Sequence, residues 1–472
     1  MGINESSPSV KLVSLAFVLV SAILSVGNWH IAAQYGIHSI FYLIFASLFF
    51  MVPVAFVSCE LASSYSSFGG IFHWIKDAFG IKPAILSAWL MWVSNVVWYP
   101  TVFTFMTRCL LYYFEFSSVD SRLLTFVIMN VLFWSGNFIN IYGYKFSSKV
   151  LSLSVLFSMV IPACLLIGFG VLKYYIGLDS PAFSHHDLSD FIPKDQKGFI
   201  LLTGLLLGFT GMEMAMSHYH AVDEPKKYFP KAIWLSTFFL IFISILGTLG
   251  ISQAIPKENI NLISDSLDAI YYYLKLFKLE KLMPWINTLI SFGTWLGMSA
   301  YLAEPSKAFF QAVKFSGLSR GLAKSNEYSI PTTIMIIQGI FVTLISIPFA
   351  LFPDSSDFYW LLTDIASQLY LVIYVMMFFA VIKVKVIKKT FPINIIPFKE
   401  KGIVFLGTVG ASLSLVCFVF GCLPPERTSH TYPLLYSSFV IIFISAMALV
   451  PLMVLKYKRL RKSLADEKSY EI

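Results

Sequence analysis

The sequence predicts an all-α membrane protein with about twelve transmembrane helices, arranged as a 5+5 inverted repeat with two extra C-terminal helices. Of the 472 residues, 57% are hydrophobic and only 13% are charged, which is too little charge to cover a soluble surface. Apolar runs of about 20 residues, the length that crosses a hydrocarbon core of about 30 Å, recur along the whole chain. Lys and Arg gather in alternate loops between these runs, as they do on the cytoplasmic side of membrane proteins.

Apolar runs bounded by Gly, Pro and clusters of charge define the predicted spans. They lie near residues 12–35, 39–63, 83–114, 122–142, 148–175, 197–220, 230–254, 282–311, 331–352, 357–383, 401–423 and 431–456. Spans 1 to 5 make up a first repeat over residues 12–175, and spans 6 to 10 make up a second over residues 197–383. Spans 11 and 12 form the pair over residues 401–456. An N-terminal segment, residues 1–11, and a tail, residues 457–472, flank them.

The distribution of Lys and Arg predicts the orientation. Most of the 34 basic residues fall near the N-terminus, in the loops after even-numbered spans and in the C-terminal tail. The positive-inside rule therefore places both termini in the cytoplasm. Spans 1 to 5 then begin inside and spans 6 to 10 begin outside, so the two five-helix units have opposite topologies. The longest stretch between spans, residues 255–281, is predicted to hold a gate-side loop helix.

Two other function classes are weighed against transport. A net charge of +8 raises nucleic-acid binding, but the basic residues lie in short loops and not on one soluble face, so the lipid bilayer is the expected partner and nucleic acid is not. For a membrane enzyme, the sequence contains no HExxH, no GxSxG on a loop and no GxxxxGK[ST]. The prediction is a transporter and not an enzyme, with no cofactor and no metal site.

The first helix of each predicted repeat carries a candidate interruption at corresponding depth. Inverted-repeat transporters bind substrate near the bilayer midplane, where these two helices are broken. Free N–H groups at one half-helix and free C=O groups at the other suit the carboxylate and ammonium of an amino acid. The alternative is that these glycines are close helix contacts. The predicted substrate-binding residues are Ser25, Val26, Gly27 and Asn28 in span 1, and Gly208, Phe209, Thr210 and Gly211 in span 6.

Three stretches resemble the amino acid, polyamine and organocation (APC) superfamily. The run from Gly211 Met212 Glu213 through Asp223 Glu224 Pro225 Lys226 Lys227 resembles its span 6 signature. The segment 60–72 resembles its span 2 loop, and the segment 304–331 resembles its span 8 to span 9 connection. Within the superfamily, GMExxxxH in span 6, Pro305 Ser306 Lys307 in span 8 and Trp98 Tyr99 Pro100 in span 3 are most similar to the bacterial glutamate/GABA antiporter group.

This resemblance implies a LeuT-like fold and a small-molecule amino acid substrate. It implies secondary active antiport of an amino acid for a decarboxylated amine or another amino acid, by alternating access. A proton-coupled amino acid symporter is the alternative. The resemblance also implies a multi-pass protein of the bacterial cell inner membrane, and it leaves a homodimer open.

Further residues are expected to couple or gate transport. An ionisable group inside a span is functional by default, so Glu213, His218 and Glu304 are candidates for proton coupling or pH sensing. Glu213 has the alternative of a helix-locking hydrogen bond, and Glu304 that of an ion pair with Lys307 one turn away. Because members of the superfamily close over substrate with bulky rings, the resemblance makes Trp98, Tyr99, Trp295 and Tyr301 the predicted gates, with Phe209 as a further candidate.

Overall fold

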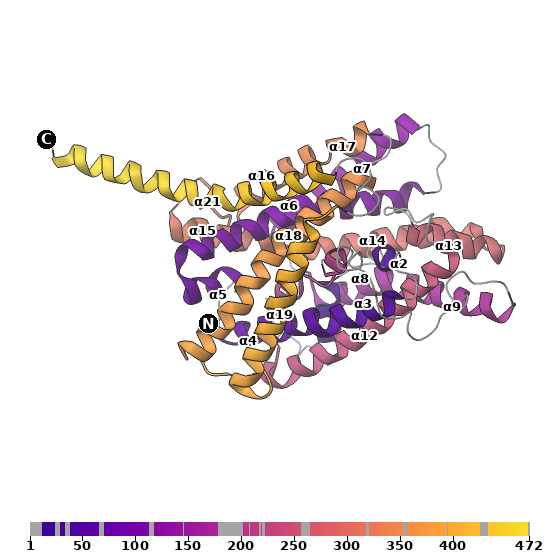
Figure 1. Ribbon diagram of the computed structural model, residues 1–472. Helices are drawn as coiled ribbons and strands as arrows, with labels where there is room; N and C mark the ends of the chain where they lie inside the picture. Colours follow the sequence, from indigo (N-terminus) through magenta and orange to yellow (C-terminus); the bar gives the residue numbers. More distant parts are fainter. Residues whose placement is uncertain are drawn as a thin grey trace, which may run out of the picture.

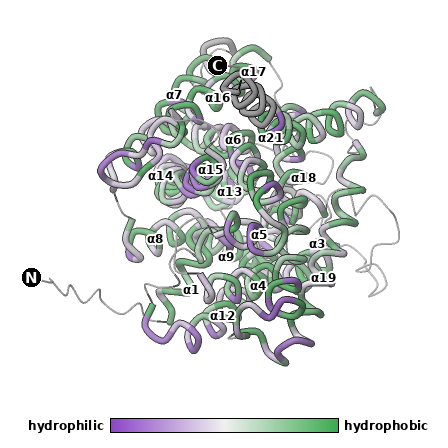
Figure 2. Tube along the Cα trace, turned by 90° about the vertical axis from the view of Figure 1, so that its left-hand side faces the viewer, coloured by the Kyte–Doolittle hydropathy of each residue, from purple (hydrophilic) through white to green (hydrophobic). Residues whose placement is uncertain are grey.

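The computed structural model describes residues 12–23, 29–33, 38–65, 70–112, 118–144, 146–177, 202–206, 208–216, 219, 222–255, 265–317, 321–352, 356–393, 395–424 and 433–470. These residues form helices and connecting turns and contain no strand. Figure 1 shows the helices packed side by side in one bundle, from which the C-terminal helix extends. Along most helices hydrophobic residues predominate, and hydrophilic stretches are short (Figure 2).

The N-terminal half of the chain contains a broken first span and a long third span. Its elements are α1 (Leu12–Ser21), α2 (Trp29–Ala33), α3 (Ser39–Ala46), η3 (Ser47–Met51), α4 (Val52–Ala62), α5 (Gly70–Phe79), α6 (Ile81–Leu111), α7 (Ser118–Ile141), α8 (Ser148–Val155), η4 (Leu156–Val160) and α9 (Ile161–Tyr175). The π-helical turns η3 and η4 join their flanking helices into continuous spans.

The C-terminal half begins with a second broken span. A short helical piece, 202–206, is followed by α11 (Met212–Ala215), α12 (Pro225–Ala254), α13 (Asp265–Leu276), η8 (Glu280–Leu282), α14 (Met283–Tyr301), α15 (Ala303–Ser316), α16 (Thr332–Ile345), α17 (Ile347–Leu351), α18 (Ser356–Val381), η9 (Ile382–Ile387), α19 (Lys399–Gly421) and α21 (Pro433–Tyr470). The expected helix within 255–281 is α13.

Within the described residues, eight helical stretches are long and apolar enough to cross a membrane. The chain is therefore a multi-pass membrane protein. Counted by length and apolar composition, the described helices therefore do not reproduce the predicted number of about twelve spans. The first and sixth predicted spans are in pieces, and α6 and α14 are long enough but too polar and aromatic to count among the eight.

Two features were not predicted. The stretch predicted as span 8, near residues 282–311, consists of two helices, because α14 ends at Tyr301 and α15 begins at Ala303. Pro305 has no N–H to donate to the carbonyl of Tyr301, which explains the end of the helix at this position. Helix α5 was not expected; its buried residues Ile71, Phe72 and Ile75 lie at the spacing of one helix face.

Helices α6 and α18 hold the bundle together. Helix α6 contacts α5, α7, α14, α15 and α18, while α18 also packs along α19 (Figure 1). On the other side of the bundle, α12 contacts α1, α2 and α9. This arrangement places the two broken spans between α6 and α12, with buried side chains from both around them.

Candidate functional site

The two interrupted spans meet at Gly211. Helix α1 ends at Ser21, and α11 starts after Gly211, which has φ +104°. A Cβ atom at Gly211 would lie 2.4 Å from the carbonyl oxygen of Ala22. Only glycine combines this backbone conformation with so close an approach. The glycine thus brings the end of the first half-helix of span 1 against the break in span 6.

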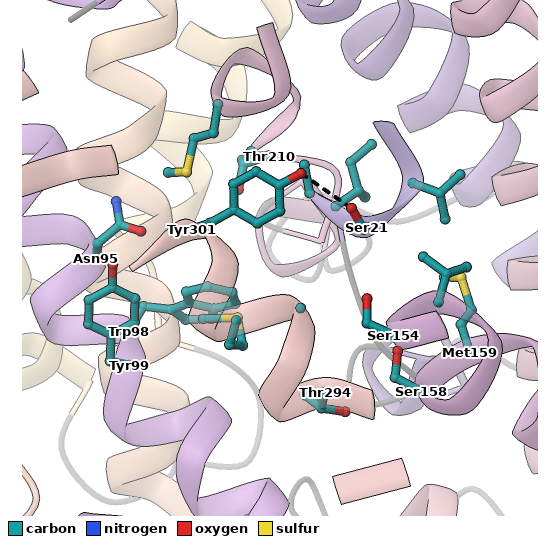
Figure 3. Close-up of a pocket in the computed structure, with 18 of the residues that line it drawn as sticks. Ser21, Asn95, Trp98, Tyr99, Ser154, Ser158, Met159, Thr210, Thr294 and Tyr301 are labelled. Atoms are coloured by element: carbon teal, nitrogen blue, oxygen red, sulfur yellow. Dashed lines mark hydrogen bonds between the residues drawn. The ribbon is translucent and has the colours of Figure 1, made fainter. Parts of the chain in front are cut away.

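A cavity of about 60 Å³ opens beside this contact, which is room for more than one water molecule. Its walls come from the end of α1, from 210–214, and from α6, α8, η4, α14 and α18 (Figure 3). Most of its lining surface is apolar, and a few hydroxyl and amide groups supply the polar part. The lining residues with polar atoms include Ser21, Asn95, Tyr99, Ser158, Thr210 and Thr294. Such walls suit a small polar molecule that needs several hydrogen-bond partners.

Tyr301 fastens α14 to α1 at the edge of this cavity. Its hydroxyl donates to the carbonyl of Val18 at 3.3 Å and lies 3.2 Å from the Ser21 hydroxyl (Figure 3). The Ser21 hydroxyl donates to the same Val18 carbonyl at 2.8 Å. Both hydroxyl groups thus bond to the backbone of the last turn of α1. Trp98 and Tyr99 also line the cavity, so all three stay candidates for gating.

Glu213 is bonded to the break in span 6. Its Oε2 atom accepts hydrogen bonds from the Tyr374 hydroxyl at 2.7 Å and from the Gly211 N–H at 3.2 Å. The Gly211 N–H also donates to the Tyr374 oxygen at 3.1 Å. The Oε1 atom of Glu213 is buried and has no hydrogen-bond partner among the described residues. The helix-locking hydrogen bond is therefore present, and a proton-coupling role for Glu213 stays a prediction.

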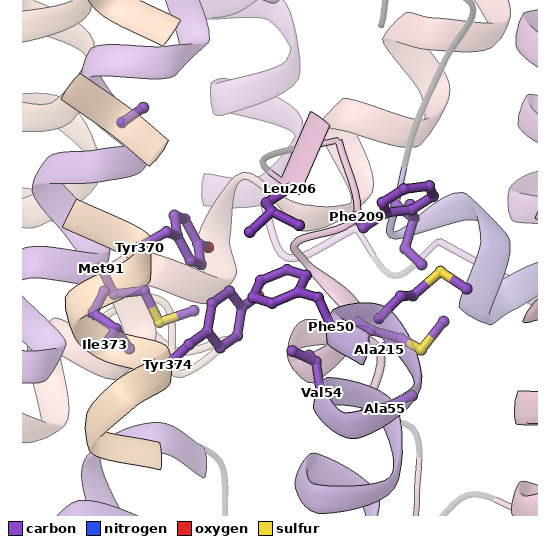
Figure 4. Close-up of a cluster of buried hydrophobic side chains, with 14 of the residues drawn as sticks. Phe50, Val54, Ala55, Met91, Leu206, Phe209, Ala215, Tyr370, Ile373 and Tyr374 are labelled. Carbon is purple, nitrogen blue, oxygen red and sulfur yellow. The ribbon is translucent and has the colours of Figure 1, made fainter. Parts of the chain in front are cut away.

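An apolar cluster surrounds the ring of Tyr374. Phe50 packs edge-on against it with ring centroids 5.3 Å apart, and Leu206, Val54 and Ala55 lie nearby (Figure 4). Tyr374 is fully buried. One turn earlier on α18, Tyr370 faces the cavity and accepts a hydrogen bond from Asn95 at 3.0 Å. Tyrosines one turn apart connect the cavity wall with the Glu213 carboxylate.

The structure separates the remaining candidates. Gly208 and Phe209 line a second, smaller cavity, whereas Thr210 and Gly211 line the first. Ser25, Val26, Gly27, Asn28 and His218 lie outside the described residues.

Glu304 and Trp295 are bonded to residues outside the cavity lining. Glu304 forms an ion pair with Lys307 at 2.9 Å in the first turn of α15, which confirms the alternative expected for it. The Trp295 ring N–H donates to the carbonyl of Leu132 at 3.0 Å and lies 3.2 Å from the Ser135 hydroxyl, both on α7. Neither residue lines the cavity. The Glu304 ion pair lies within α15 and the Trp295 contacts join α14 to α7, so neither supports a coupling or gating role.

Sequence reasoning missed the tyrosines of α18. Tyr370 and Tyr374 stand four residues apart in an apolar helix, a spacing that puts two hydroxyl groups on one face. That pattern was the available signal. Within the described part of the chain, no three His, Cys, Asp or Glu residues are grouped as metal ligands.

Comparisons with known proteins agree on one class of protein, membrane transporters. The model of the family described as amino acid permease matches residues 10–446. The chain is 30% identical over 442 residues to an uncharacterized transporter of Legionella pneumophila, covering 93% of this chain and 94% of the relative. It is 24% identical over 449 residues to a glutamate/gamma-aminobutyrate antiporter of Lactococcus lactis, covering 92% and 88%. A probable agmatine/putrescine antiporter of that species is 23% identical over 406 residues, 82% of each chain.

Proposed function

Because the chain belongs to the amino acid permease family, we propose that it is a secondary active antiporter that exchanges an amino acid for a decarboxylated amine or another amino acid. Transport proceeds by alternating access at the cavity between the two broken spans. The observation that carries this proposal is the contact of Gly211 with Ala22, which joins two interrupted helices at a polar cavity. Antiporter relatives at 23–24% identity support exchange as the mode.

The cavity offers partners for both charged groups of an amino acid. The carbonyls of Val18 and Val20 are bonded within the protein, and the other carbonyl groups at the end of α1 can accept hydrogen bonds from an ammonium group. Ser21, Asn95 and Thr210 add neutral polar groups around it. The substrate carboxylate is assigned to residues Ser25 to Asn28, which follow the first half-helix in the sequence.

The membrane arrangement is part of the same proposal. The two units over residues 12–175 and 197–383 form a LeuT-like inverted repeat, and residues 401–456 add the last two spans. Both termini lie in the cytoplasm, as the basic loops favour. The relatives named above come from bacteria, which supports placement in a bacterial inner membrane. Equal labelling of engineered cysteines in both tails from the periplasmic side would contradict this orientation.

Counterflow in proteoliposomes tests the exchange. Labelled glutamate, arginine, leucine and alanine are offered to empty vesicles and to vesicles preloaded with the same unlabelled compound or its amine. Exchange predicts fast uptake only into preloaded vesicles. Uptake of none of the labelled compounds under any condition would contradict the proposal.

A cavity-filling variant ties that activity to the site. Gly297 lines the cavity, so Gly297→Val should reduce exchange at least tenfold. Gly168→Val is the matched control, because Gly168 is also helical but has no atom within 4 Å of an added Cβ. Equal loss of exchange in both variants would show that the cavity is not the site.

Proton-coupled symport is the second candidate, and the environment of Glu213 favours it specifically. A buried carboxyl group that is bonded to both the span 6 break and Tyr374 can pass a change of charge directly to the binding region. Symport predicts uptake into empty vesicles driven by an inward proton gradient. Glu213→Gln should then flatten the pH profile of uptake while the folded protein stays in the membrane. An unchanged profile removes Glu213 from coupling.

A further inference from the structure

A second cavity of about 30 Å³ lies next to the first and is lined by fewer polar side chains. Its walls come from α2, α3, α12, η4 and residues 205 and 208–209. Nearly all of the lining side chains are apolar, including Ala32, Leu43, Leu205 and Leu240, and Ser244 supplies the one side-chain hydroxyl among the described lining residues. Each of these side chains is at least nine-tenths buried. A site of this kind favours hydrocarbon over water.

One wall of this second cavity is held in place by close packing. The Trp29 ring lies against Gly247 of α12, where an added Cβ would be 2.3 Å from a ring carbon. Trp29 is 3% exposed, so its ring is buried in the bundle. The tryptophan therefore closes this side of the cavity as a fixed surface.

The two cavities share walls. Ile23 and Met159 line both of them, so one layer of side chains separates the polar cavity from the apolar one. Methionine is unbranched and flexible, which lets it make way for another apolar group at small cost. Phe209, next to Thr210 of the polar cavity, belongs to the apolar one. The residues that line both cavities, Ile23 and Met159, are thus apolar.

We propose that the apolar cavity is a side-chain pocket, and that the substrate is a neutral amino acid with an aliphatic side chain. This inference rests on the proposed function, since the amino and carboxylate groups occupy the polar cavity beside Ser21 and Gly211. The aliphatic chain passes between Ile23 and Met159 and ends against Leu240 and Ser244. The pocket determines which amino acids are bound, and the polar cavity binds the part that all of them share.

The chemistry of the pocket discriminates by charge and by length. Each methylene transferred from water into an apolar site tightens binding about fourfold. A side-chain carboxylate or guanidinium in the same place loses its hydration without a charged partner among the described lining residues. The expected substrates therefore differ from the compounds named for the relatives from Lactococcus lactis, which carry a charge at the far end of the molecule.

Competition with a homologous series tests the pocket. Purified full-length protein is bound to labelled leucine, and alanine, 2-aminobutyrate, norvaline, norleucine, glutamate and arginine compete. Affinity should rise about fourfold per methylene from alanine to norvaline, and the two charged compounds should compete at least tenfold more weakly than norvaline. Affinity that is independent of chain length, or tighter binding of glutamate or arginine, would overturn the inference.

Variants locate the effect in the second cavity. Ser244→Leu should fill the pocket and weaken norvaline at least tenfold while alanine changes less than twofold. Ser236→Leu is the control, because Ser236 is a buried serine two turns earlier on α12 that lines neither cavity. Leu240→Ala enlarges the pocket and should shift the preference towards norleucine, which keeps the test open if Ser244→Leu fails to fold. An equal effect of Ser244→Leu on alanine and norvaline, or no shift with Leu240→Ala, refutes the pocket.

The failure of this inference is distinct from the failure of the proposed function. Exchange of glutamate or arginine without leucine binding would reject the aliphatic pocket and keep the antiporter. Absence of exchange for every compound in the counterflow panel would reject the antiporter itself.

Discussion

Replacing Gly211 with alanine should separate the two broken spans. The backbone at Gly211 has φ +104°, a conformation that side chains of L-residues rarely adopt and that costs about 1–3 kcal/mol. The added Cβ would also lie 2.4 Å from the Ala22 carbonyl oxygen, about 1 Å inside ordinary van der Waals contact. Because that neighbour is backbone, it can yield only if the end of span 1 moves. Overpacking of this kind adds about 1–3 kcal/mol, which gives about 2–6 kcal/mol in all.

The matched control is Gly80→Ala. Gly80 has φ +91° and no atom within 4 Å of an added Cβ. The substitution there therefore costs only the backbone strain, about 1–3 kcal/mol of stability. Thermal unfolding of purified protein in detergent measures both variants, and binding of a labelled amino acid measures the site. Gly211→Ala should unfold at a lower temperature than Gly80→Ala and bind at least tenfold more weakly. Equal unfolding temperatures together with wild-type affinity would refute the argument that close approach of the two breaks builds the site.

Three other predictions concern single contacts. Lys385→Met removes the cation 2.6 Å from the buried Glu60 carboxylate and should lower the free energy of unfolding by about 3–5 kcal/mol. Adding Glu60→Gln should recover part of this loss, and fully additive effects of the two substitutions in thermal unfolding would contradict a stabilising ion pair. Burial and the neighbouring Lys76 lower the pKa of His73 in α5, so the unfolded chain binds the proton first and stability is lost as pH falls below about 6.5. His73→Gln should make the unfolding temperature less dependent on pH between pH 7 and 5, and an unchanged dependence would contradict this role of His73. Trp98→Ala should weaken substrate binding at least tenfold and Trp295→Ala less than twofold, because of these two residues only Trp98 lines the cavity. The reverse order of effects would mean that Trp295 is the gate.

Buried contacts of Glu60 illustrate how far local sequence reasoning reaches. Glu60 lies at the end of predicted span 2, where a buried carboxylate needs polar partners. In the structure it accepts hydrogen bonds from the N–H groups of Ile395 and Ile396 at 2.7 and 3.0 Å and pairs with Lys385. The type of interaction was predictable because a buried charge requires partners. Its partners, more than 300 residues away, were not.

The sequence alone determined the class of protein, most of the helix positions and the interruption at Gly211. These features are local: hydropathy over about 20 residues fixes a span, and glycine permits the backbone of a break. Only the tertiary structure decided which side chains face the cavity. Trp295, a predicted gate, bonds to α7 and does not line the cavity, while Tyr370 and Tyr374 were overlooked and connect the cavity wall to Glu213. In lipid, both the buried and the exposed faces of a helix are apolar, so hydropathy does not reveal its rotation; packing against neighbouring helices sets it.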